Sequence, residues 1–142
     1  MAQVSFETGN GARLHEQHDG TGDAYFEKMY NGSGNTVGNK YPGDGAKFSG
    51  TGYIHLTGRY NYQKFADYIN DQKIMQEGWS YVESNYAWEA AGYFWSVLTR
   101  ANSVASNPNV HPDDLSKIVN FHDKNTFAKR ANIYYNICEA IK

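Results

Sequence analysis

The chain of 142 residues has little cysteine and no excess of positive charge. Its only cysteine, Cys138, excludes an internal disulfide and a zinc site built on several cysteines. Lys and Arg total 13 against 15 Asp and Glu, which excludes the basic surface typical of nucleic-acid-binding proteins. No apolar run is long enough to span a bilayer, and the N-terminus lacks the pattern of a signal peptide. We therefore expect a protein made as a soluble cytoplasmic chain, with no nucleic-acid partner and no membrane span.

Apolar residues recur at helical spacing along much of the sequence. Residues 2–8 run into Gly9, which favours a helix stopped by glycine. Pro112 followed by two aspartates is typical of the first turn of another helix. From Asn85 onward the helical period places large side chains on one face, which we expect to be core: Trp88, Ala91, Trp95 and Leu98. The sequence predicts one mainly α domain over residues 1–142.

The densest motif is the segment Lys47–Tyr62, which reads KFSGTGYIHLTGRYNY. Its three glycines allow the backbone to approach a ligand closely or to adopt positive φ. Apolar residues between the glycines supply anchors, and polar groups of Thr57, Arg59 and Asn61 are expected to project from the segment. The pattern indicates a short strand or an irregular wall of a groove.

This segment resembles the motif that lines the sugar cleft in family 19 glycoside hydrolases, the plant-type chitinases and related phage endolysins. The sequence departs from the motif at Thr51, where the family usually has Arg, and at His55, where it usually has Gln. The matching residues, in register, are Phe48, Gly50, Gly52, Ile54, Leu56, Thr57, Gly58, Arg59, Asn61 and Tyr62.

A first candidate carboxylate, Glu7, lies in AQVSFETGN near the expected end of the first helix. The helix dipole disfavours a negative charge there and so favours the protonated acid, although an ordinary exposed glutamate fits the local sequence as well. The stretch resembles the family segment Ala-Gln-x-x-His-Glu-Thr/Ser-Gly, whose Glu is the general acid. Glu7 matches that position, while Phe6 replaces the usual His.

Two glutamates are candidates for the second carboxylate. Glu16 lies nine residues after Glu7, which is the spacing at which endolysins of the family carry their second catalytic Glu. Glu27, in AYFEKMY, is the alternative because plant chitinases place the base further along the chain. The endolysin-like spacing favours Glu16.

A metal site is conceivable at His15, His18 and Asp19, but the spacing is not that of a His-Glu-x-x-His helix. We therefore expect a polar loop and no metal there. Nearer the C-terminus, KIVNFHDKNTFAKRANIYY resembles the family's Ile-Asn-Gly-Gly segment with an Arg about ten residues later. Asn120 and Arg130 match, whereas Phe121 and His122 replace the glycines.

The resemblance implies a mostly helical, lysozyme-like fold of two lobes, with a small irregular β or loop region lining the cleft. It implies hydrolysis of β-1,4 bonds between N-acetylated amino sugars with inversion and without a cofactor. Glu7 would be the acid and Glu16 the base, and the Thr57 hydroxyl would accept from the attacking water and donate to Glu16. The residues expected to bind sugar or steady the acid are His55, Arg59, Asn61, Asn120 and Arg130.

The substrate implied is a glycan, either peptidoglycan or chitin. The compact length and the absence of disulfides favour a phage or bacterial lysozyme-type enzyme that acts on the bacterial cell wall. A catalytically inactive sugar-binding module is the alternative of another class, favoured by the changes at Thr51 and Phe6. Only six residues precede Glu7, where the family has a further helical segment, so we expect another domain or a partner chain to supply that segment.

Overall fold

Helices make up most of the computed structural model, which describes residues 1–16 and 22–141. Within these residues no strand forms, and β structure is limited to isolated bridges of Thr51 with His15 and with Leu56. The predicted mainly α fold is confirmed. The elements are α1 (Ala2–Thr8), α2 (Gly22–Tyr30), α3 (Asp44–Lys47), α4 (Arg59–Ile69), α5 (Lys73–Glu77), α6 (Trp79–Tyr93), the π-helical turn η1 (Phe94–Leu98), α7 (Ala101–Ala105), α8 (Pro112–Asn120), the 3-10 turn η2 (Lys124–Thr126) and α9 (Phe127–Ala140).

Local signals set the ends of two helices that matter for the site. Helix α1 stops at Gly9, which adopts the left-handed conformation with φ 57° and ψ 55°, as the sequence predicts. Helix α8 begins at Pro112. There the His111 side chain accepts a hydrogen bond from the Asp113 N–H, and the Asp114 carboxylate accepts one from the His111 N–H. The predicted helix start at Pro112 is also confirmed.

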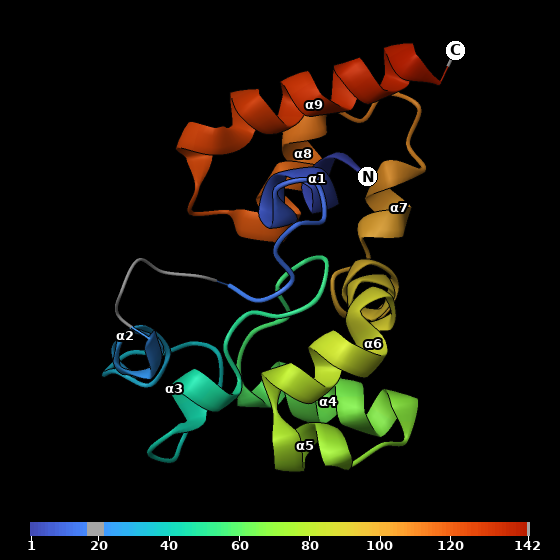
Figure 1. Cartoon of the computed structure of the whole chain (residues 1–142). Helices are drawn as coiled ribbons and strands as arrows, with labels where there is room; N and C mark the ends of the chain where they lie inside the picture. Colours follow the sequence, from blue (N-terminus) through green and yellow to red (C-terminus); the bar gives the residue numbers. More distant parts are fainter. Residues whose placement is uncertain (17–21, 142) are drawn as a thin grey trace.

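The helices form two groups, one at each end of the molecule (Figure 1). Helices α1, α7, α8 and α9 lie in one group, where α9 packs on both α1 and α8. Helices α4, α5 and α6 pack on one another in the other group, beside the contacting pair α2 and α3. The loop that leads from α3 to α4 passes between the two groups (Figure 1).

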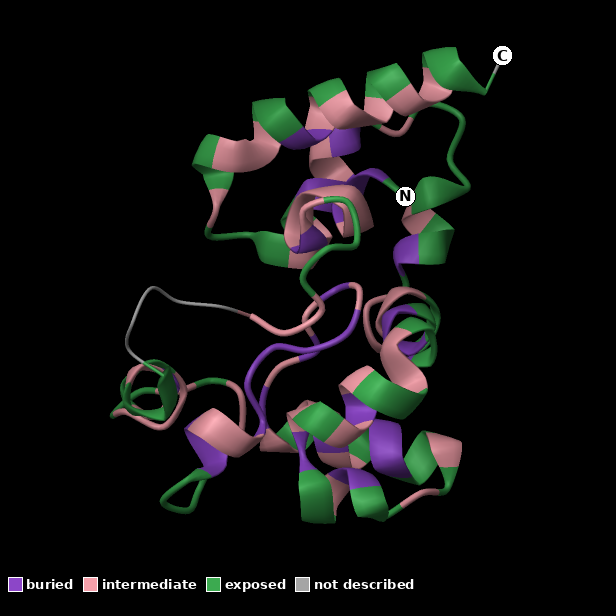
Figure 2. Cartoon of the chain, viewed as in Figure 1, coloured by how far each residue is buried: buried purple, intermediate pink, exposed green. Residues whose placement is uncertain are grey.

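That loop belongs to the Lys47–Tyr62 segment and is largely interior, as Figure 2 shows by its purple colour. Phe48 and Leu56 join the main hydrophobic cluster, and the hydroxyl of Tyr62 donates to the carbonyl of Ser49 at 2.7 Å. The segment predicted as a groove wall is therefore also part of the core. The other members of the cluster come from α4, α5 and α6: Phe65, Ala66, Ile74, Val82, Ala90 and Tyr93.

The expectation that Trp88 is a core residue is wrong. Trp88 is 53% exposed and stacks on Tyr53 with ring centroids 3.9 Å apart. Helix α6 contains a non-helical residue, Tyr86, with φ −140° and ψ 24°, and it continues into the π-helical turn η1. The π-helical turn breaks the period only after Ala91, whereas Trp88 is exposed because its ring packs on Tyr53 and not on the main hydrophobic cluster. None of the helices that the structure describes has the length and apolarity needed to cross a membrane.

Candidate active site

Glu7 sits in the last turn of α1 and is held from behind by α9. Its Oε1 lies 2.8 Å from Nη2 of Arg130, and its side chain is 16% exposed. The remaining exposure is toward a pocket, which Glu7 helps to line. The ion pair therefore fixes the direction of the carboxylate without closing it off.

Arg130 itself is 1% exposed and does not reach the pocket surface. Its Nη1 donates to Oε1 of Gln3 at 2.8 Å, and its Nε donates to the hydroxyl of Thr126 at 3.1 Å. The guanidinium carbon lies 4.1 Å from the ring centre of Phe6, the residue that stands where the resemblance has His. The sequence predicts that Arg130 either binds sugar or steadies the acid. Its geometry fits the second role, because it pairs with Glu7 from behind the pocket.

Glu16 approaches the pocket from the loop that follows α1. Its backbone N–H donates to the carbonyl of Gly50 at 2.8 Å. The hydroxyl of Tyr30, at the end of α2, lies 2.8 Å from each carboxylate oxygen of Glu16. Burial, together with the adjacent Glu16 carboxylate, raises the pKa of Tyr30, so the phenol keeps its proton and acts as a donor.

Gly50 allows three functional side chains to crowd together. A Cβ added to Gly50 would lie 2.8 Å from Oε2 of Glu16, 3.0 Å from Cβ of His55 and 3.1 Å from Oγ1 of Thr57. Any larger residue would push these groups apart. Glycine is therefore required at position 50 because side chains approach it closely, and not because its φ is positive.

One pocket of about 180 Å³ collects Glu7, Glu16, His55, Thr57 and Asn120. The other lining residues are Tyr30, Ile54 and Val119. They come from α1, α2, α8 and the two connecting loops, so the pocket lies where the two groups of helices meet. Five of the eight residues singled out from the sequence are thus brought to one place.

Thr57 lines the pocket, and the proton of its hydroxyl already makes a hydrogen bond within the protein. The hydroxyl donates to the carbonyl of His55 at 2.7 Å. A hydroxyl has one proton, so the expected donation to Glu16 is not made, whereas its lone pairs can accept from a water molecule. Asn61 lies behind this turn, where its Nδ2 donates to the carbonyl of Thr57 at 2.8 Å. Asn61 is therefore placed to fix the turn.

Arg59 lies away from the pocket. It donates to both oxygens of the buried Asp44, from Nε at 2.7 Å and from Nη2 at 2.6 Å. Its guanidinium also lies over the rings of Tyr41 and Phe48. The bidentate pair ties the start of α4 to α3.

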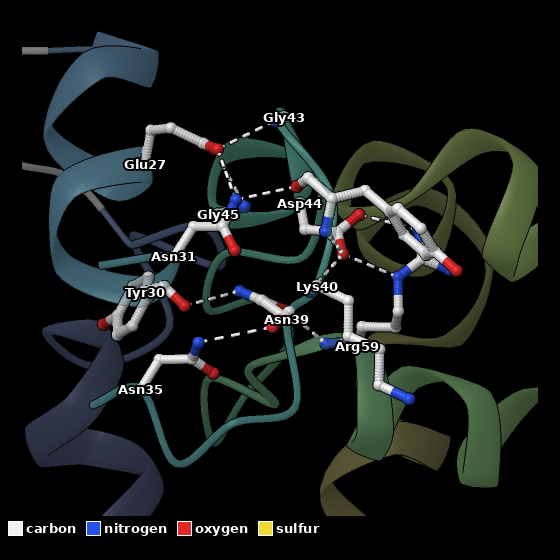
Figure 3. A network of polar contacts seen from close by, with 11 residues as sticks. Glu27, Tyr30, Asn31, Asn35, Asn39, Lys40, Gly43, Asp44, Gly45 and Arg59 are labelled. Carbon is white, nitrogen blue, oxygen red and sulfur yellow. Dashed lines mark hydrogen bonds and ion pairs between the residues drawn. The ribbon is translucent and has the colours of Figure 1, made fainter. Parts of the chain in front are cut away.

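The Arg59–Asp44 pair belongs to a wider polar network around the loop from α2 to α3 (Figure 3). Asn39 accepts from the Arg59 backbone N–H at 2.7 Å and donates to the carbonyl of Tyr30 at 3.0 Å. The network therefore reaches Tyr30, the residue that holds Glu16. Arg59 is thus linked to Tyr30 through Asn39 and does not line the pocket.

Glu27, the alternative base, is committed to the same network (Figure 3). Its Oε1 accepts from Asn31 at 2.6 Å and from the Gly43 N–H at 2.8 Å, and its Oε2 accepts from the Gly45 N–H at 3.0 Å. The hydrogen bond from Asn31, with further bonds from the backbone, lowers the pKa of Glu27 although burial opposes the shift. It lines another pocket, with Trp79 and Lys47, which does not include Glu7.

Metal binding finds no support in the part of the chain that the structure describes. No cluster of three or more His, Cys, Asp or Glu side chains within those residues is suited to a metal ion. His18 and Asp19 of the sequence hypothesis lie outside the described residues. His15 stacks on Trp79, with ring centroids 3.7 Å apart, and its Nε2 lies 2.8 Å from the Ser49 hydroxyl.

Sequence reasoning missed Tyr30, Ile54 and Val119 as pocket residues. Ile54 belongs to the glycine-rich motif and Val119 precedes Asn120, so adjacency to candidate residues was an available signal. Tyr30 had no such signal, because its contact with Glu16 depends on how α2 packs. Thr51 and Phe6, the positions that depart from the family pattern, line no part of this pocket. Thr51 is fully buried.

No protein-family model matches the sequence, and a search of curated proteins finds no match. The function must therefore be inferred from the chemistry of the pocket and from the motifs of the sequence.

Proposed function

We propose that this chain is a lysozyme-type glycoside hydrolase that cleaves β-1,4 bonds between N-acetylated amino sugars of peptidoglycan with inversion. The observation that carries the proposal is the shared pocket of Glu7 and Glu16. The two carboxylates come from separate elements and are held by different partners, Arg130 and Tyr30. A pair of separately held carboxylates around one pocket is the arrangement that glycoside hydrolysis requires.

The two glutamates have different surroundings and take different roles. Glu7, in its protonated form, donates its proton to the glycosidic oxygen as the bond to the anomeric carbon breaks. Glu16 accepts a proton from a water molecule, whose oxygen attacks the anomeric carbon from the opposite face. Tyr30 keeps Glu16 aimed at that water by donating to its carboxylate. Because the proton of Thr57 is bound to the carbonyl of His55, Thr57 serves the water as an acceptor.

The pocket also supplies polar groups for the sugar. Asn120 is exposed at the end of α8 and lines the pocket opposite the motif segment. Its amide can donate to and accept from sugar hydroxyl or acetamido groups. His55 also lines the pocket, beside Glu7. Chitin carries the same acetamido groups, so a chitinase is the competing reading within this class.

Release of reducing ends from purified cell walls, run beside a chitin oligosaccharide, tests the proposal. We expect release from the walls, and a loss of about 10²–10⁴-fold for Glu7→Gln, because Gln has no acidic proton to donate. Glu16→Gln should lose more activity than Glu27→Gln, whose side chain instead supports the fold. Hydrolysis of chitin alone would assign a chitinase. Binding to walls without release would assign an inactive sugar-binding module.

The stereochemistry has its own measurement. NMR of the first-formed anomer from a soluble glycan fragment should show an α product from a β link. A β product would mean retention, and the water-activating roles of Glu16 and Thr57 would then be wrong.

A further inference from the structure

Trp88 lies on a second hollowed surface of the molecule, between α1 and α6. Two pockets make up this surface, one of about 250 Å³ and one of about 510 Å³. Both are lined by Met1, Val4 and Trp88, so together they form one site, the Trp88 surface. Neither Glu7 nor Glu16 lines it, and it is therefore distinct from the candidate active site.

The ring of Trp88 is fixed on one face and open on the other. It stacks on Tyr53 with ring centroids 3.9 Å apart and an angle of 22° between the planes. The Tyr53 N–H donates to the carbonyl of Ala87 at 3.3 Å, which ties the motif segment to α6. Trp88 is nevertheless 53% exposed, so the face opposite Tyr53 is open to a ligand. An aromatic ring that is already held in place loses little conformational entropy when a ligand binds to it.

Gly92 leaves a hollow beside this ring. Among the residues that the structure describes, no atom comes within 4 Å of a Cβ added at Gly92, apart from its chain neighbours and its own helix backbone. Trp88, four residues earlier, and Trp95, three residues later, line the same pocket. Glycine weakens a helix, and packing against the protein does not require it at this position. The two indoles therefore border a space that a ligand group can fill.

The side chains around the hollow carry no formal charge. Among the described residues that line either pocket there is no Asp, Glu, Lys, Arg or His. The Ser96 hydroxyl accepts from Asn102 at 2.9 Å and keeps its own proton for a ligand. Asn10 accepts from the Ser5 hydroxyl through its carbonyl oxygen, so its amide N–H groups can donate to a ligand. Aromatic faces beside neutral polar groups suit a neutral ligand with apolar faces and hydroxyl groups at its edge, which describes a sugar ring.

We propose that the Trp88 surface is a second glycan-binding site, where an N-acetylated sugar stacks on the open face of Trp88 and places its acetyl methyl group in the hollow at Gly92. The choice of a glycan as the ligand rests on the proposed function. Ile54 lines both the smaller pocket of this surface and the candidate active site, so the two sites adjoin at the motif segment. A long glycan bound at the Trp88 surface stays close to the catalytic glutamates, an advantage that a short fragment does not receive.

NMR of the tryptophan indole N–H signals can locate the binding of a soluble neutral glycan, chitotetraose. The chain has three tryptophans, of which Trp79 lines another pocket. The titration is made in the Glu7→Gln variant, which should bind the sugar without hydrolysing it. We expect chitotetraose to shift the signals of Trp88 and Trp95. A shift of Trp79 alone would place the sugar elsewhere and overturn the inference.

Two variants test the hollow and the stacking face separately. Gly92→Leu fills the hollow, and it should be at least as stable as the parent because it removes a glycine from a helix. Trp88→Ala removes the stacking face. Each should weaken chitotetraose binding, followed by the Trp95 signal, about tenfold. Ala128→Leu is the matched control, because Ala128 is an exposed residue of α9 that lines neither pocket.

Unchanged affinity for chitotetraose in both variants would overturn the inference. Indole shifts that appear when the protein concentration is raised without sugar would also overturn it, because they would assign the surface to a second copy of the chain. With Glu7 restored, both variants should keep the wild-type kcat on a short soluble glycan fragment and lose about tenfold in kcat/KM on cell walls. Hydrolysis of walls without any indole shift would overturn this inference alone. Binding at Trp88 without hydrolysis by the wild type would overturn the proposed function alone.

Discussion

Replacing Arg130 by Met should destabilise the protein strongly and misplace Glu7. The side chain is 1% exposed and makes four polar contacts: 2.8 Å to Glu7, 2.8 Å to Gln3, 3.1 Å to Thr126 and 3.9 Å to Asp123. Breaking a buried ion pair by removing one partner costs about 3–5 kcal/mol, because the remaining charge loses its compensation. Met keeps apolar contact with Phe6, so we expect a loss near the lower end, about 3–4 kcal/mol. For a chain of this size that corresponds to a fall in Tm of about 10 °C.

The assay is thermal and urea unfolding of four proteins: wild type, Arg130→Met, Glu7→Gln and the double variant. Gln at position 7 still accepts a hydrogen bond from the guanidinium, so Glu7→Gln should cost less, about 1–3 kcal/mol. Removing both partners leaves no unpaired charge, and the double variant should be more stable than the sum of the single effects by about 1–2 kcal/mol. Additive single effects would refute the reasoning, because they would mean that the pair contributes no coupling.

Three further outcomes follow from the contacts described. Tyr30→Phe removes the donor to the base and should lower the hydrolysis rate about tenfold, while an unchanged rate would exclude Tyr30 from the site. Thr57→Val should lose activity but less than Glu7→Gln in parallel rate measurements, and a loss of stability without a loss of rate would leave the hydroxyl a purely structural role. Burial opposes ionisation of Asp44, but hydrogen bonds from Arg59 and the backbone prevail and lower the pKa of Asp44 below its usual value of 3.8. Its contribution to stability is therefore present above that pH and lost as the pH falls through the lowered value, so Asp44→Asn should be less stable than wild type at pH 7 by about 2–4 kcal/mol. In melts from pH 7 to pH 2 the difference should close as the pH falls through the lowered pKa of Asp44, and a constant difference would contradict this account.

Features that depend on neighbouring residues could be predicted from the sequence. The stop of α1 at Gly9 and the start of α8 at Pro112 follow from capping preferences, which operate within a few residues. The exposure of Trp88 could not be predicted in this way, because its ring packs on Tyr53, a residue distant in the sequence, and not on the main hydrophobic cluster. A helical pattern indicates which residues share a face, but it does not show what covers each of them.

The residues of the site also divide into those that the sequence predicts and those that depend on tertiary packing. The sequence singles out Glu7, Glu16 and Thr57 by their motif positions in separate segments, and all three line one pocket. The Tyr30 contact with Glu16 depends on the packing of α2 and on the network through Asn39. The sequence distance between Arg59 and Asp44 likewise says nothing of their bidentate pairing. Which polar groups face the pocket and which support it from behind is decided by tertiary packing.

The contacts that hold α1 against α9 join residues that are made at very different times during synthesis. Arg130 and Gln3 are separated by 127 residues, so α1 is synthesised well before α9, which holds it. Gln3 also binds Ser116 of α8, 113 residues away. Contacts between such distant residues close late, because the entropy of a long loop must be overcome first. A nascent chain that has not yet produced residue 130 therefore presents Glu7 without its guanidinium partner, and the pocket becomes complete only after α9 has been made.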